Sequence, residues 1–112
     1  MKFTKEKLAE LLNRTTALNL PYTDLTAADL RGANMKDANL FKANLENADL
    51  SGADLSGATL YKANLTGANL ADANLTEVNL GGANLERAHL EGANLKNTKL
   101  KGAIMPDGTV HK

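Results

Sequence analysis

A large aliphatic residue recurs at every fifth position of the chain, from Leu20 to Met105. This central position holds leucine 16 times and methionine twice, so 18 consecutive repeats share one register. The residue two positions before the centre is alanine in 14 repeats, and the residue between them is asparagine in ten repeats and aspartate in four. Two variable residues follow the centre, and the second of them is glycine seven times. The apolar pattern therefore has a period of five.

A period of five fits neither a continuous helix nor a continuous strand. On an α-helix, a step of five residues turns by about 500°, so successive leucines lie about 140° apart and form no stripe. On a strand, residues five apart point to opposite faces. A chain that buries every centre must therefore turn once in each repeat, with the alanine and the centre pointing inward and the two variable residues forming the corner. The pattern predicts an all-β solenoid.

Residues 4–14, ahead of the repeats, have the pattern of a short amphipathic helix. The leucines from Leu8 onward share one apolar face, Thr4 is the expected N-cap, and Phe3 is spaced to pack on Leu8 as a hydrophobic staple. Since a solenoid needs its exposed ends covered, capping is the favoured role. Membrane binding is the alternative, and it is disfavoured because the helix is short and carries charges of both signs.

The chain beyond the last repeat begins with a turn signal at Pro106, and the tail after it is too short to cover the end of a coil. That end is the expected surface for self-association, which predicts a monomer or a weak end-to-end dimer through the C-terminal coil. The expected organisation is a capping helix and linker over residues 1–17, repeats over 18–105, and a C-terminal turn and tail over 106–112.

The run Ala-(Asn/Asp)-Leu-x-x, as in Ala43-Asn44-Leu45, resembles the repeat of the pentapeptide-repeat family, and the resemblance covers about 88 residues. It implies a right-handed quadrilateral β-helix, in which four pentapeptides make one square coil of twenty residues, and about four and a half coils in all. It also implies a bacterial, and especially a cyanobacterial, source, and a biochemical role that is undefined for most short members.

Stacking at intervals of twenty residues predicts how polar positions are used. Columns such as Asn44, Asn64 and Asn84 are expected to form side-chain amide ladders from coil to coil, rather than a row of binding groups. A corner residue such as Thr66 is expected to face solvent.

Little in the sequence supports catalysis. There is no cysteine, which excludes disulfides, thiolate metal sites and cysteine nucleophiles. The serines Ser51 and Ser56 fall at corners, and the histidines are His89 and His111, so no converging catalytic triad is expected. A zinc site needs three or four convergent ligands. We therefore expect no enzymatic activity, no metal and no cofactor, and, because no signal peptide or membrane span is evident, a cytoplasmic location.

The 13 basic and 13 acidic residues balance, so no affinity for nucleic acid or membranes is expected. Residues 43–91 carry a net charge of −5 and residues 92–112 a net charge of +3, which places an acidic middle before a basic end. The resemblance offers one alternative function, because some pentapeptide-repeat proteins mimic DNA and inhibit or protect DNA gyrase. A net charge of −5 is small beside the charge of duplex DNA, so this alternative is disfavoured.

The aromatic residues outside the cap fall into one predicted column. With twenty residues in a coil, the residues just after three successive centres stack beside the residues that follow them. This candidate interaction patch consists of Pro21, Tyr22, Phe41, Lys42, Tyr61 and Lys62. Exposed apolar groups of this kind serve recognition, or else the rings shield the coil edges by packing on each other. Both interpretations remain open, and the function expected is a non-catalytic interaction or scaffold module with an unidentified protein partner.

Overall fold

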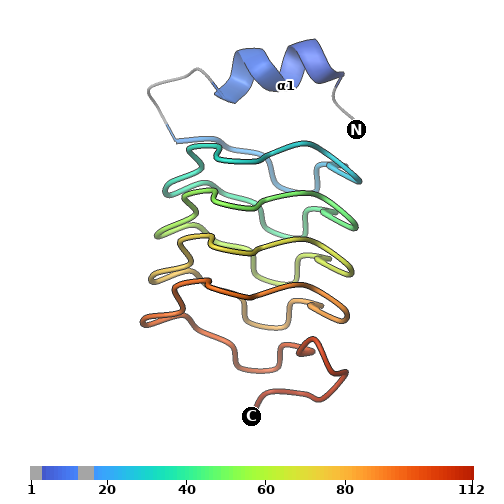
Figure 1. Ribbon diagram of the computed structural model, residues 1–112, viewed down its shortest axis with the longest axis vertical. Coiled ribbons are helices and arrows are strands. Elements are labelled where there is room, and N and C mark those ends of the chain that lie inside the picture. The colour runs from blue at the N-terminus through green and yellow to red at the C-terminus, as the bar shows by residue number, and fades with distance from the viewer. Residues whose placement is uncertain (1–3, 13–16) are drawn as a thin grey trace.

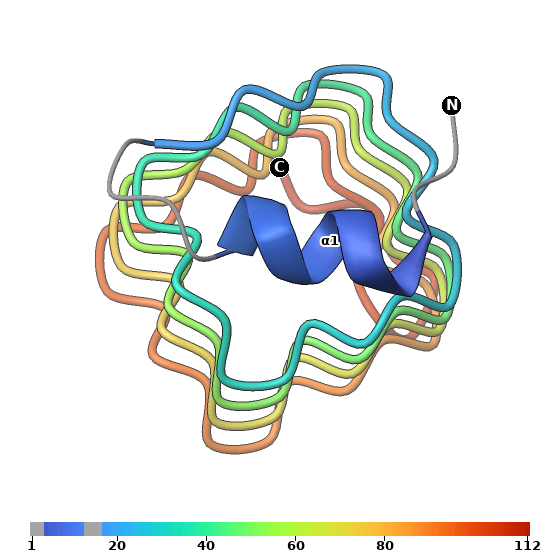
Figure 2. The same cartoon turned by 90° about the horizontal axis from the view of Figure 1, so that it is seen from above.

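The computed structural model describes residues 4–12 and 17–112. A short helix, α1 (Lys5–Leu12), lies across one end of a stack of square coils (Figure 1). Parallel bridges of single residues join positions twenty apart, from Asn19 with Asn39 to Asn84 with Ile104, so four pentapeptides complete each coil. Seen from the helix end, the chain turns clockwise as it recedes (Figure 2). The fold is therefore the right-handed quadrilateral β-helix that the resemblance to pentapeptide repeats implies.

The centres of the repeats fill the interior. Those from Leu25 to Leu85 are at most 2% exposed, and the alanines from Ala38 to Ala83 are at most 1% exposed. Val78, which occupies an alanine position, is buried without breaking the bridges on either side of it. Because burying a leucine side chain stabilises a fold by roughly 1.5–3 kcal/mol, this column of centres is the main source of stability.

Four of the five backbone N–H groups in an inner repeat bond to backbone carbonyls. The residue before the centre donates to the preceding coil, while the centre and the second turn residue donate to the next coil. The alanine of the next repeat closes the turn, as where the Ala58 N–H donates to the Leu55 carbonyl at 2.9 Å. The one group left over is the N–H of the first turn residue.

Where the residue before the centre is asparagine or aspartate, its side chain accepts that remaining N–H. In one repeat the Ser56 N–H donates to Asp54 Oδ1 at 3.0 Å, and the Ser56 hydroxyl donates to the same oxygen at 2.7 Å. The same side-chain turn recurs from Asp24 to Asn94. A short polar side chain is needed here because only it reaches the N–H two residues onward.

The predicted amide ladders are therefore largely wrong. Asn39 Nδ2 donates to Asn19 Oδ1 at 3.0 Å, which is one bond of the predicted kind. Within residues 17–112, no such bond joins the proposed column of Asn44, Asn64 and Asn84, because each amide oxygen accepts the N–H of its own turn. Coil-to-coil bonding is done by the backbone instead.

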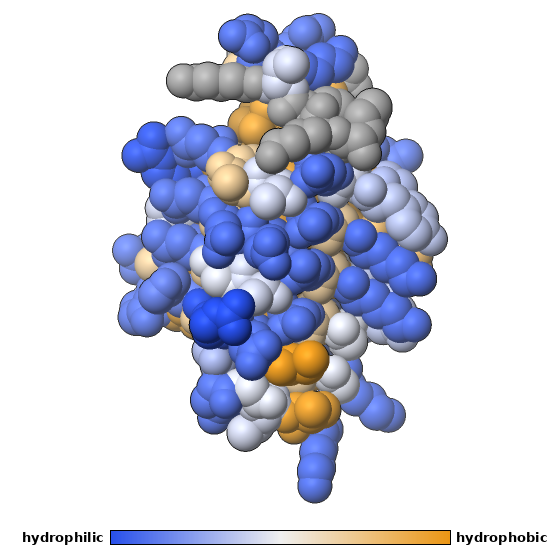
Figure 3. Space-filling model, turned by 90° about the vertical axis from the view of Figure 1, so that its right-hand side faces the viewer, coloured by the Kyte–Doolittle hydropathy of each residue, from blue (hydrophilic) through white to orange (hydrophobic). Residues whose placement is uncertain are grey.

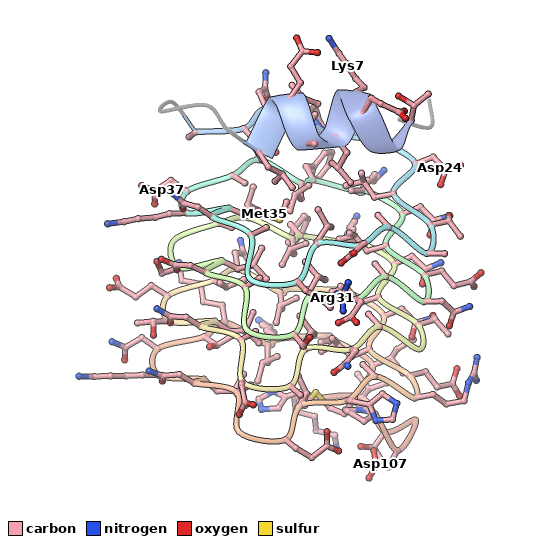
Figure 4. All side chains as sticks on the ribbon, turned by 45° about the horizontal axis from the view of Figure 1, so that its top comes forward. Lys7, Asp24, Arg31, Met35, Asp37 and Asp107 are labelled. Carbon is pink, nitrogen blue, oxygen red and sulfur yellow. The ribbon has the colours of Figure 1, made fainter. Side chains whose placement is uncertain are left out.

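The second turn residue of each repeat adopts a left-handed conformation. Its φ lies between 54° and 79° in the repeats from Tyr22 to Gly102, in seven glycines and ten other residues. At Gly57 a side chain would also collide with the carboxylate of Asp37, which lies directly over it and projects from the outer edge of the coil (Figure 4). Since a left-handed non-glycine residue costs about 1–2 kcal/mol, the stacked backbone bonds hold ten strained turns in place.

Helix α1 covers the N-terminal end of the core. The Lys7 N–H donates to Thr4 Oγ1 at 3.1 Å, which confirms the predicted N-cap, and Leu8 and Leu11 are buried against the first coil. Lys7 itself points away from the coils (Figure 4). The helix is described as far as Leu12, and the last two residues of the predicted cap, like the expected staple residue Phe3, lie outside the described residues. No helix within residues 4–12 and 17–112 is long and apolar enough to cross a membrane.

The tail covers one side of the opposite end. Val110 forms an antiparallel bridge with Ile104, and the Gly102 N–H donates to the His111 carbonyl at 2.8 Å. Within residues 17–112 the tail pairs with this one side, and Leu95 on another side is 38% exposed. Figure 3 shows hydrophobic surface gathered toward this end of one face.

Replacing Leu60 by lysine is expected to abolish cooperative unfolding. The side chain is fully buried, and a buried unpaired charge costs several kcal/mol, a large share of the stability of a domain this size. Thermal and urea unfolding followed by circular dichroism will measure it. Thr66 is no control, because it is 8% exposed and its hydroxyl donates to Asn64, contrary to the sequence expectation. The matched control is Glu77→Lys, at the position that Lys62 occupies elsewhere, which should cost under about 1 kcal/mol; equal losses would contradict the inward assignment.

Acid should weaken the fold partly through Asp54. The hydroxyl of Ser56, and then its N–H, hold the pKa of Asp54 below the ordinary value of 3.8. A carboxyl whose pKa is lowered by folding stabilises the protein above its unfolded pKa, and this contribution is lost as the pH falls through the folded pKa. Between about pH 6 and about pH 2, urea unfolding should therefore show a smaller loss in Asp54→Asn than in the unaltered protein. Conversely, Asn74→Asp should enlarge the loss of unfolding free energy over the same pH range. If both variants lost as much as the unaltered protein, this role of the carboxylate would be contradicted.

Candidate functional site

The twenty-residue register brings the six candidate residues together on one side of the coil. Bridges join Asn19 to Asn39, Asn39 to Thr59 and Thr59 to Asn79, and each of these residues lies two positions before the first residue of a turn. The turns that follow the first three therefore stack, and they carry the candidate residues in two adjoining columns: Pro21, Phe41 and Tyr61, and Tyr22, Lys42 and Lys62. We refer to these six residues as the aromatic column.

The three rings touch in sequence. The Tyr22 and Phe41 rings meet edge to face, with centroids 5.5 Å apart, and the Phe41 and Tyr61 rings are parallel, with centroids 6.0 Å apart. Tyr22 is 64% exposed and Tyr61 is 38% exposed, while Phe41 between them is half-buried. Ring pairs at these distances contribute about 0.5–1.5 kcal/mol beyond the area they bury, so the column stiffens the coil and also exposes apolar edges.

Two lysines border the rings. Lys42 Nζ lies 5.9 Å from the Tyr22 centroid and 5.6 Å from the Phe41 centroid, and Lys62 Nζ lies 5.5 Å from the Tyr61 centroid. Such cation–π contacts are worth about 0.5–1 kcal/mol at exposed sites. Within the described part of the chain, the hydroxyls of Tyr22 and Tyr61 have no hydrogen-bond partner. The column therefore presents rings, ammonium groups and two phenol hydroxyls to solvent.

Two glycines lie in the coil directly below the column, and sequence reasoning did not identify their role. A Cβ at Gly81 would lie 3.0 Å from the Tyr61 ring, and a Cβ at Gly82 would lie 3.2 Å from the Lys62 side chain. Bare backbone at these positions lets both side chains lie flat on the next coil. The available signal was Gly81 itself, since no other repeat has glycine directly after its centre.

Charge is segregated by side as well as along the sequence. The side with the aromatic column consists of residues 18–22, 38–42, 58–62, 78–82 and 98–102, which hold four lysines and no acidic residue. Each of the other three sides has a net negative charge. The acidic middle of the sequence is thus not a band around the coil, because its carboxylates occupy three sides and leave the fourth basic.

On the opposite side, Arg31 and Asp29 form a two-pronged ion pair, with Nε–Oδ1 and Nη2–Oδ2 distances of 2.8 Å. The hydrogen bond with Asp29, and then the charge of Asp29, raise the pKa of Arg31 above its ordinary value. The pair is exposed, so it organises surface charge and adds little to stability.

His89 and Ser56, two of the side chains considered for chemistry, already have polar neighbours at the surface. Within residues 4–12 and 17–112, no three His, Asp or Glu residues are placed to hold a metal ion. His89 Nδ1 lies 3.9 Å from Glu91 Oε1 at the surface, and the Ser56 hydroxyl is bonded to Asp54.

A half-open groove of about 470 Å³ lies between α1 and the first coil. Its lining is mostly aliphatic and comprises Thr4, Leu8, Ala9, Leu12 and residues 24–29. Asp24, at the helix end of the first coil (Figure 4), already accepts bonds from the N–H and hydroxyl of Thr26. This groove could not be predicted from the sequence because its shape depends on where the helix crosses the coil.

Comparison with known families and structures gives a consistent result. The family model described as "Pentapeptide repeats (8 copies)" matches residues 16–47, 38–76 and 68–105. A comparison with curated protein sequences gave no match.

Three solved structures are similar over most of the chain. The pentapeptide repeat protein Rfr23 from the cyanobacterium Cyanothece 51142 is 39% identical, with a TM-score of 0.81 over 89% of this chain and 68% of its own. A pentapeptide repeat protein from Nostoc PCC 7120 is 33% identical, with a TM-score of 0.75 over 83% of this chain and 75% of its own. A pentapeptide repeat protein from the thylakoid lumen of Arabidopsis thaliana is 31% identical, with a TM-score of 0.51 over 98% of this chain and 75% of its own.

Proposed function

The chain belongs to the pentapeptide-repeat family, and from that premise we propose that it is a non-catalytic docking module whose aromatic column binds an acidic protein partner. The observation that carries the proposal is the segregation of charge: the side that exposes the stacked rings is also the side that holds four lysines and no carboxylate.

The partner follows from the chemistry of the column. Ring edges and phenol hydroxyls favour a surface with apolar side chains and hydrogen-bond acceptors, because tyrosine offers contact area at a low cost in side-chain entropy. Lys42 and Lys62 favour carboxylates, which speed association and fix the orientation of the complex. Neighbouring sides are negative and repel such a partner, so docking is confined to one side of the coil.

The rest of the site supports binding rather than turnover. Catalysis requires convergent acids and bases in a cleft, whereas the column consists of rings, lysines and a proline, and the groove beside α1 is lined by residues outside it. The proposal places this docking in the cytoplasm, the compartment expected from the sequence.

Reversing the two lysines is expected to release the partner without unfolding the coil. The full-length chain, immobilised, is exposed to a lysate of the source organism, and bound proteins are compared between the unaltered chain and the variant Lys42→Glu with Lys62→Glu. We expect at least about a tenfold loss of the specific partner, since each lost charge pair weakens an interface several-fold. The melting temperature should fall by only a few degrees, because the cation–π contacts are weak.

The matched control is Lys7→Glu with Lys36→Glu, which makes the same change in net charge away from the column. The variant Phe41→Ser with Tyr61→Ser separates the two roles of the rings. Lost capture with a nearly unchanged melt assigns them to recognition. Unchanged capture with a lower melt assigns them to the scaffold and contradicts the proposal.

A second prediction concerns DNA mimicry. We expect the chain to leave the supercoiling activity of DNA gyrase unchanged at micromolar concentrations, because a DNA mimic needs a long negative surface and one side of this coil is basic. A supercoiling assay over a dose series, with an acidic DNA-mimic protein as positive control, will measure this. Dose-dependent inhibition would favour the gyrase hypothesis over docking through the aromatic column.

A further inference from the structure

The last coil ends in an edge whose backbone groups have no partners. Every inner coil donates from its centres and second turn residues to the coil below, and the last coil has none below it. Over residues 88–100, which we name the open edge, the centres and second turn residues with unpaired N–H groups are Leu90, Gly92, Leu95, Asn97 and Leu100. The core is also uncovered there, since Leu95 is 38% exposed where inner centres are fully buried.

The tail shows how such an edge is filled. Three groups of the last coil bond to it: the Gly102 N–H to the His111 carbonyl (2.8 Å), the Ala103 carbonyl to the His111 N–H (2.8 Å), and the Met105 N–H to the Thr109 carbonyl (2.7 Å). These groups are a second turn residue, an alanine-position carbonyl and a centre. An extended segment of three residues, running antiparallel, therefore satisfies one side of a coil.

The same three groups recur, empty, on the open edge. One set lies five residues earlier and consists of the Asn97 N–H, the Thr98 carbonyl and the Leu100 N–H. The repeat is uniform, so this set has the spacing of the set that the tail occupies. The sheet edge is thus a ready site for strand addition.

Charge selects the occupant. The empty set is flanked by three exposed lysines, Lys96, Lys99 and Lys101. A second copy of the chain would add its own three lysines to the same interface, and an end 23 Å by 22 Å across offers only roughly 500 Å² per copy, at the lower limit for a stable interface. An acidic segment meets neither obstacle.

We propose that the open edge at Asn97–Leu100 binds a short, extended, acidic segment of a partner protein, added antiparallel as a strand beside the tail. Its backbone pairs with the three empty groups, an apolar side chain covers Leu95 or Leu100, and flanking carboxylates pair with the lysines. This inference shares Lys99 and Lys101 with the basic side of the coil, but it does not depend on the rings or on Lys42 and Lys62, because it concerns the end of the coil.

The probe is a fluorescein-labelled peptide, Glu-Asp-Leu-Thr-Val-Asp-Glu, titrated into the full-length chain and followed by fluorescence anisotropy. Two matched peptides separate the contribution of charge from that of backbone pairing. One has lysine in place of every acidic residue, and the other has N-methyl groups on alternate residues, which removes backbone donors. We expect both to bind at least tenfold more weakly than the acidic peptide. In a ¹⁵N-labelled chain, the amide signals of Asn97 and Leu100 should shift and gain protection from exchange.

Variants of the chain complete the test. Lys96→Glu with Lys99→Glu should weaken the acidic peptide at least tenfold, while the equally charged control Lys7→Glu with Lys36→Glu should not. Lys42→Glu with Lys62→Glu should leave peptide binding intact, which keeps this result separate from the aromatic column. Equal affinity for the acidic and lysine peptides, or unshifted Asn97 and Leu100 amides, would overturn the proposal. So would sedimentation of the free chain as a dimer with those amides already protected, which would assign the edge to a second copy.

Discussion

A chain that turns every five residues must satisfy five backbone N–H groups in each turn, and this accounting governs the rest of the molecule. Four of the groups bond to carbonyls, three of them in the neighbouring coils, where residues twenty apart lie in register, and the fifth bonds to a short polar side chain two residues earlier. Leucine burial supplies the driving force, and the hydrogen bonds hold each coil in this register. The same backbone hydrogen bonds hold ten non-glycine residues at a positive φ.

The fold could be predicted from the sequence because the sequence pattern is periodic. One apolar position in five excluded a helix and a strand, and the Thr4 cap could be read from local rules. The role of Asp54 and its equivalents could not, because both an amide ladder and a side-chain turn are compatible with a polar residue before each centre. Only the geometry of the turn shows that this side chain accepts the N–H of the first turn residue, two positions onward. Thr66 was misjudged for the same reason, since its hydroxyl folds back on Asn64.

The surface was less accessible to sequence reasoning than the core. The stacking of Phe41 on Tyr61 follows from the register alone, whereas the sorting of charge by side was hidden by counting along the chain, because neighbouring repeats face different directions. Gly81 illustrates the difference: in the sequence it is one glycine among nine, and in the coil it is the floor beneath the Tyr61 ring. A side of this coil is a set of residues drawn from the whole chain.

That arrangement limits how such a chain can change its length. Deleting one pentapeptide between Phe41 and Tyr61 would rotate every later repeat by a quarter turn about the axis, carrying Tyr61 away from Phe41 and setting residues 63–67, which hold neither a ring nor a lysine, beneath Lys42. Deleting or adding twenty residues would instead shorten or lengthen the stack and leave each side with its own chemistry. The backbone tolerates either change equally well, since every repeat offers the same bonds. Surface identity, rather than stability, therefore makes the whole coil the smallest unit by which the chain can grow.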